Sequence, residues 1–159
     1  ALALGVEPAE PGVLRRGPRP RERRLISQHS LVPIGVMGAL IGLTTIAGYV
    51  IGRQLDGPDL PASLAFATLV GSQLSSSLVF RSETLPFVRL ARNTWLLSAI
   101  AASALVVVLV FVLPVTRDAF DLAALTPGQW LTVIGLSLIP LVLGEATKLV
   151  LARRRDTAR

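Results

Sequence analysis

The sequence has 159 residues, the length of one ordinary domain, but its composition is not that of a soluble protein. Hydrophobic residues make up 52% of it and charged residues only 16%, whereas soluble domains carry roughly 25% charge. The net charge of +6 does not indicate a nucleic-acid-binding protein, because the basic residues form clusters between long uncharged stretches and are not interleaved with aromatic residues.

The residues that most enzymes and metal sites need are nearly absent. The chain has no cysteine and a single histidine, His29, which excludes disulfides, thiolate metal sites and a pair of histidine ligands. Phosphate-binding loops, dinucleotide fingerprints, nucleophile elbows and zinc-protease motifs are also missing from the sequence. We therefore predict no catalytic residue and no cofactor site on this chain.

Residues 1–30 are predicted to form a cytoplasmic connector that follows an upstream helix. Leu2, Ala3 and Leu4 are apolar, as at the end of a helix, and Glu7–Arg24 is too rich in proline and arginine for a regular element. The chain starts at Ala1 and has no signal-peptide pattern. We therefore expect it to be a piece of a longer protein.

Charged residues then bracket four uncharged windows of 21 residues or more: Leu25–Gly52, Leu60–Phe80, Asn93–Thr116 and Leu122–Gly144. About 20 apolar residues are enough for a helix to cross the hydrocarbon core of a bilayer. The prediction is an all-α integral membrane protein with four antiparallel spanning helices, near Leu31–Ile51, Ala62–Phe80, Asn93–Leu113 and Pro127–Ala152. Residues 31–152 form this membrane domain, and 153–159 form a basic cytoplasmic tail.

The fourth helix has the clearest predicted start. Thr126 and Gln129 have the spacing of a capping box, and Pro127 suits the first helical position. Trp130, like Trp95 at the start of the third helix, is placed for an interfacial aromatic belt. Pro140 should bend the fourth helix, and the backbone groups that it frees require a packed neighbour.

The basic residues predict the orientation. Fourteen of the 16 Lys and Arg residues fall in the first tail, the middle connection and the C-terminal end, and only Arg53 and Arg117 fall in the other two connections. Positive residues are enriched on the cytoplasmic side of membrane proteins, so both chain ends are expected in the cytoplasm of a multi-pass cell-membrane protein.

The first helix carries the G-x-x-x-G pairs Gly38/Gly42 and Gly48/Gly52, which give a smooth face for close helix approach. One interpretation is a dimer interface. We favour structural packing of Gly38 and Gly42 against other helices of the same parent protein.

Polar residues of the second helix share a broad arc: Thr68, Ser72, Gln73, Ser75 and Ser76. Gln73 lies about 18 Å along the helix from Pro61, near the middle of the membrane. A polar amide at that depth marks either an ion path or an interhelical hydrogen bond, and its position does not separate the two. Gln73 is the candidate cation ligand, and Ser72 and Ser76 are weaker candidates.

Glu145 and Lys148 form an i,i+3 pair near the cytoplasmic end of the fourth helix. Mutual pairing and snorkelling of Lys148 both lower the cost of charges in the membrane. We interpret them as a structural pair and not as a transport carboxylate with its counter-ion.

Several segments resemble the C-terminal part of the calcium-pump-like (type II) P-type cation-transporting ATPases. They are, in chain order, Ala3-Leu4-Gly5-Val6-Glu7-Pro8, Leu14–Arg19, Asn93-x-Trp95-Leu96-Leu97, Pro114–Phe120, Leu125–Trp130 and Glu145-x-x-Lys148. Leu14 and Gly17 depart from the family's usual Met and Pro. Gln73 stands where some calcium pumps have a Glu that contributes to one of two ion sites.

The resemblance implies that the four helices are the seventh to tenth of a ten-helix pump. They would buttress the ion-binding helices and contribute to the ion path. The partners implied are the upstream helices and cytoplasmic domains, the lipid bilayer and the transported cation; the ATP and Mg sites would lie upstream, and no nucleic acid is implied. The alternatives are a freestanding small multidrug-type transporter, which would want an acidic residue within Leu31–Ile51, and a non-enzymatic membrane scaffold.

Overall fold

The computed structural model of the chain describes residues 28–81 and 93–157. Over these ranges it contains helices and no strand, in the order α2 (Gln28–Arg53), α3 (Leu60–Val79), α4 (Thr94–Val112), α5 (Pro114–Ala119) and α6 (Pro127–Thr157). Four of them contain a stretch long and apolar enough to cross a membrane: Val32–Arg53, Leu60–Val79, Thr94–Val112 and Pro127–Leu149. The prediction of an all-α membrane fold with four spanning helices is confirmed.

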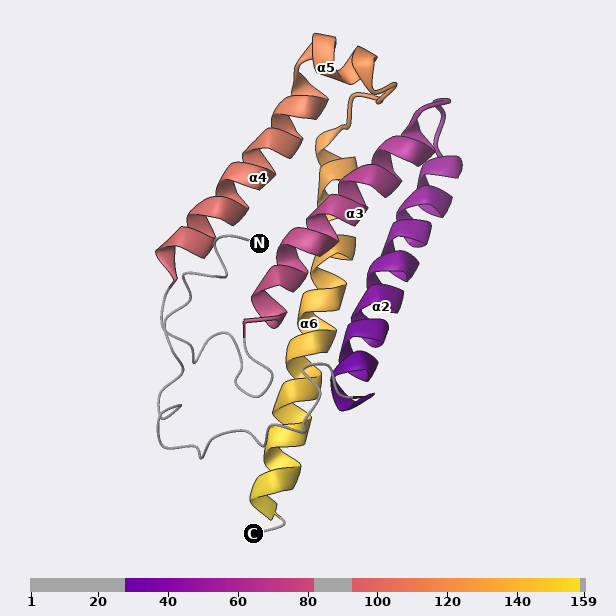
Figure 1. Cartoon of the computed structure of the whole chain (residues 1–159). Helices are drawn as coiled ribbons and strands as arrows, with labels where there is room; N and C mark the ends of the chain where they lie inside the picture. The colour runs from indigo at the N-terminus through magenta and orange to yellow at the C-terminus, as the bar shows by residue number, and fades with distance from the viewer. Residues whose placement is uncertain (1–27, 82–92, 158–159) are drawn as a thin grey trace.

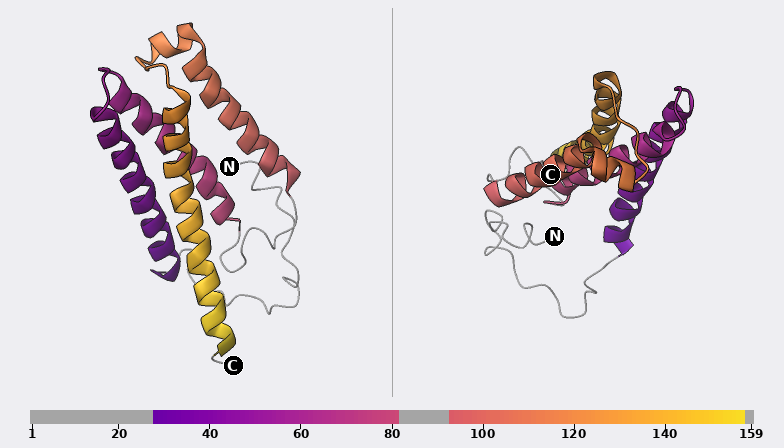
Figure 2. Two further views of the ribbon diagram at one scale, coloured as in Figure 1. Left: turned by 180° about the vertical axis from the view of Figure 1, so that it is seen from behind. Right: turned by 90° about the horizontal axis from the view of Figure 1, so that it is seen from above.

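The central helix of the bundle is α3, which packs against both α2 and α6 (Figure 1). The α2–α3 loop and α5 lie at one end of the bundle, here called the α5 end. The view from behind in Figure 2 shows α6 running across the whole length of the bundle. Helix α4 joins the others through Phe111, which clusters with Leu64 and Ala67 of α3 and Val133 of α6.

Local hydrogen bonds define where the helices begin. At α6 the Thr126 N–H donates to Gln129 Oε1 at 2.7 Å, and the Gln129 N–H donates to Thr126 Oγ1 at 3.4 Å, so the predicted capping box is confirmed. At α4 the side chain of Asn93 accepts from the Leu96 N–H at 3.0 Å. Pro140 is fully buried within α6, as expected for a helix packed against neighbours.

Two elements differ from the prediction. The connection from Pro114 to Thr126 contains the short helix α5. Pro114 has no N–H to donate to the carbonyl of Val110. The Thr116 hydroxyl lies 3.0 Å from that carbonyl and donates to it, so the Val110 carbonyl keeps a hydrogen bond where the chain turns. Helix α6 continues to Thr157, through most of the predicted tail, because a helix outside the membrane needs no apolar residues.

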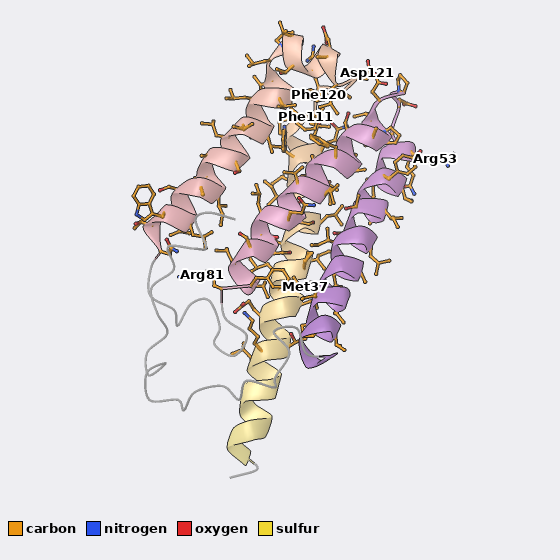
Figure 3. The ribbon with its side chains drawn as sticks, in the orientation of Figure 1. Met37, Arg53, Arg81, Phe111, Phe120 and Asp121 are labelled. Carbon is orange, nitrogen blue, oxygen red and sulfur yellow. The ribbon has the colours of Figure 1, made fainter. Side chains whose placement is uncertain are left out.

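The predicted topology can be tested by accessibility. Arg53 lies at the α5 end and Arg81 at the opposite end (Figure 3). Arg53 is one of the two basic residues expected outside the cell, and Arg81 is one of the fourteen expected in the cytoplasm. In intact cells, Asp56→Cys and Ala119→Cys, both at exposed positions of the α5 end, are expected to react with a membrane-impermeant thiol reagent. Gln28→Cys and Thr157→Cys are expected to react only after the membrane is opened. Labelling of Thr157→Cys from outside would contradict the orientation.

Candidate functional site

The contact between α2 and α3 depends on two glycines. A Cβ on Gly48 would lie 2.9 Å from Thr68 Oγ1 and 3.2 Å from the Leu64 carbonyl. A Cβ on Gly52 would lie 2.6 Å from Pro61 Cα, closer than real Cβ atoms approach. The Gly48/Gly52 pair therefore lets the two backbones touch, in the way small residues do at interfaces within membranes.

The contact between α3 and α6 is formed by Gly71 and Ser137. A Cβ on Gly71 would lie 2.9 Å from Ser137 Cβ. The Ser137 hydroxyl donates to the Thr68 carbonyl at 3.4 Å, and the Ser75 hydroxyl donates to the Ser137 carbonyl at 2.5 Å. Helix α3 is thus held at mid-height by α2 on one side and by α6 on the other.

Hydroxyls that are buried, or half-buried in the case of Ser75, line both contacts. We call the set the hydroxyl seam: Thr44, Thr68, Ser72, Ser75, Ser76 and Ser137. Ser72 and Ser76 are buried there, and the hydroxyls of Thr44 and Ser72 lie 3.2 Å apart. The hydroxyls of Thr68 and Ser76 are buried without a hydrogen-bond partner in the described ranges. The seam packs tightly, since Gly48 and Gly71 leave no space at its two crossings.

Gln73 is the member of the predicted polar arc that the seam leaves out. Its side chain is exposed, and it has no hydrogen bond within the part of the chain that the structure describes. Because 100° separates successive residues of a helix, Gln73 points about 180° away from the middle of the buried arc of α3. The structure therefore brings Ser72 and Ser76 into the seam and leaves Gln73 on a separate, uncovered face.

Gly38 and Gly42 lie on a second uncovered face, on α2. Among the residues that the structure describes, a Cβ on either glycine would meet nothing within 4 Å. Thr44, Gly48 and Gly52, which face α3, are about a third of a turn away around α2. The two G-x-x-x-G pairs of this helix thus differ: one makes the α2–α3 contact, and the other is not contacted by any described helix.

Glu145 and Lys148 are brought together as predicted. Lys148 Nζ lies 3.0 Å from Glu145 Oε1, and the two side chains are only 9% and 12% exposed. The ammonium of Lys148 also donates to the carbonyl of Val79 at the end of α3. Sequence reasoning missed this second partner, as it missed Thr44, Gly71 and Ser137, because each of them depends on which helix lies opposite.

None of these residues forms a metal centre by itself. In residues 28–81 and 93–157, no group of three or more His, Cys, Asp or Glu side chains is placed to hold an ion. The only oxygen ligand that Gln73 offers is a neutral amide, which can join other ligands around a hard cation but supplies no charge. The uncovered Gln73 face could therefore supply one ligand to a cation site but not the whole site.

Comparison with known proteins identifies the family of this chain. The family described as cation transporting ATPase, C-terminus, matches residues 1–150. This chain belongs to that family. The match confirms the resemblance that the sequence motifs indicated, and it favours neither the small multidrug-type transporter nor the scaffold.

Relatives of this membrane domain include three bacterial pumps. The chain is 35% identical over 143 residues to the calcium-transporting ATPase of Bacillus subtilis (strain 168), covering 88% of this chain and 16% of the relative. It is 29% identical over 151 residues to calcium-transporting ATPase 1 of Lactococcus lactis (93% and 17%) and 30% identical over 169 residues to calcium-transporting ATPase 1 of Bacillus cereus (94% and 19%). The chain spans less than a fifth of the length of each of these relatives.

Proposed function

We propose that this chain is the C-terminal membrane domain of an ATP-driven cation pump, and that Gln73 lends its side-chain carbonyl to the ion path. The relatives that carry a similar domain are calcium-transporting ATPases more than five times its length. The chain has no phosphate-binding motif of its own, so ATP, Mg and the catalytic domains belong to the remainder of such a pump.

The observation that carries the proposal is the exposure of Gln73 within the Leu60–Val79 span. An amide that faces hydrocarbon without a hydrogen-bond partner is costly, so polar residues within membranes face protein or a water-filled path. The seam already occupies another side of α3, centred about a third of a turn from Gln73. The Gln73 face is consequently where upstream helices would cover α3 and complete a cation site.

Cation activation of the pump's ATPase tests this role. Gln73→Ala is expected to raise the cation concentration for half-maximal activation by about three- to tenfold, the loss expected of one neutral ligand. Gln73→Leu keeps most of the volume and is expected to give the same shift. Gln54→Ala, which removes an exposed glutamine outside the spans, is the matched control and should leave activation unchanged.

A purely structural amide predicts a different outcome. Thermal stability would then change while cation activation would not, since interhelical hydrogen bonds in membranes contribute about 1 kcal/mol or less. Wild-type activation curves for both Gln73→Ala and Gln73→Glu would refute the ligand role.

A further inference from the structure

The end of α3 nearest Gln73 is held by a charge that comes from another helix. The last turn of α3 contains no basic residue, and its cap residue Phe80 donates back only to the Ser76 carbonyl. The ammonium of Lys148, on α6, donates to the carbonyl of Val79. The final carbonyls of a helix lack partners within the helix and carry partial negative charge. An ammonium there both donates a hydrogen bond to a carbonyl and interacts favourably with the helix dipole.

The position of Lys148 is fixed from both sides. Glu145 accepts from it at 3.0 Å, and both side chains are nearly buried, so the ammonium cannot move away without losing its two partners, the Glu145 carboxylate and the Val79 carbonyl. Beside them, α3 and α6 pack closely: a Cβ on Gly144 would lie 2.9 Å from Val79 Cγ1 and 3.3 Å from Met37 Sδ. Val79 is thus anchored by a hydrogen bond at its carbonyl and by packing at its side chain.

Neutral hydrogen bonds hold α3 farther from this end. The Ser63 hydroxyl accepts from the Ala123 N–H at 2.7 Å near the α5 end, and Ser75 bonds to Ser137 at mid-height. Both involve neutral groups. Lys148 is the only charged group among these three anchors, and Val79 lies six residues, or about 9 Å, beyond Gln73 on the same helix.

We propose that Lys148 is a positioning residue for the cation path, because it sets the height and rotation of α3 against α6 and thereby places the Gln73 amide. The inference rests on the proposed role of Gln73. Removing the ammonium takes away the hydrogen bond that α6 gives to the Val79 carbonyl. The end of α3 then shifts relative to α6, and the amide moves with it because the segment between them is an uninterrupted helix.

The test uses the full-length pump and measures both the thermal midpoint and the cation concentration for half-maximal ATPase activation. Lys148→Met is expected to raise the half-activation concentration about threefold or more, a shift typical of residues that act through a shared element. Lys148→Arg keeps the charge and the donors, so it should restore most of the wild-type value. Ser63→Ala, which cuts an anchor far from Gln73, is the matched control and should lower the thermal midpoint without changing half-activation.

Two results would overturn the proposal. One is a Lys148→Met pump that is destabilised like Ser63→Ala but keeps the wild-type cation concentration for half-maximal activation. If Gln73→Ala still raises that concentration, the role of Gln73 stands and only the positioning role of Lys148 is wrong. The other is a fully additive effect of Lys148→Met and Gln73→Ala on half-activation, since residues that act through one another are coupled. Should Lys148→Met fail to accumulate, Lys148→Gln, which keeps an N–H donor without the charge, takes its place and is expected to shift half-activation in the same direction.

Discussion

Gly71→Leu, at the one glycine of α3, is expected to destabilise the four-helix chain by about 3 kcal/mol. A side chain at Gly71 would occupy the space of Ser137, where even a Cβ lies 2.9 Å from Ser137 Cβ. Overpacking of this kind costs about 1–3 kcal/mol or more, and the two hydrogen bonds made by Ser137 and Ser75 across the contact would be strained as well. Leucine has a higher helix propensity than glycine, but this offsets only about 1 kcal/mol of the loss.

The thermal midpoint of the purified chain in detergent measures this effect. A loss of about 3 kcal/mol corresponds to a midpoint roughly 6–12 °C lower for a chain of this size. Gly135→Leu is the matched control, because Gly135 lies on α6 with nothing within 4 Å of its Cβ position. Its midpoint should be unchanged or slightly higher. Equal midpoints for the two variants would show that α3 and α6 do not meet at Gly71.

The spanning helices could be predicted from sequence because charge alone marks their limits. Arg53, Asp59 and Arg81 bound the first two spans within a few residues of where α2 and α3 end or begin. The capping box at Thr126 was equally local, since both of its hydrogen bonds join residues three apart. Helix α5 was not predicted, because it is only six residues long and no charged residue marks where it begins.

The candidate site was only half predictable. The polar residues of α3 could be found by eye, but a broad arc on one helix does not say where its neighbours lie. The structure divides that arc, because Ser72 and Ser76 are buried and Gln73 is exposed. The decisive contacts join residues some 30 to 70 positions apart, such as Thr44 with Ser72 and Lys148 with Val79. Such pairings follow from helix packing and not from any local pattern.

Helix packing also distinguishes the two glycine pairs of α2, so that a substitution at Gly42 is expected to act differently in this chain alone and in the full-length pump. Gly42→Leu is expected to leave the thermal midpoint of this chain unchanged or raise it, because its Cβ would enter open space and leucine favours a helix. In the full-length pump it is expected to abolish most cation-dependent ATPase activity. The proposed upstream helices would pack against the smooth Gly38/Gly42 face, and a leucine there would push one of them away.

Gly135→Leu again provides the comparison and should be silent in both contexts, since that face of α6 is open in the same way but carries no G-x-x-x-G pair. Gly38→Leu, one turn away on the α2 face, should reproduce the behaviour of Gly42→Leu. If the full-length pump tolerates leucine at both Gly38 and Gly42, this face of α2 meets lipid and the upstream helices pack elsewhere. The Gln73 face of α3 would then be the surface left for them. A loss confined to the pump would instead place a close helix contact at Gly42, since nothing in residues 28–81 and 93–157 lies within 4 Å of its Cβ position.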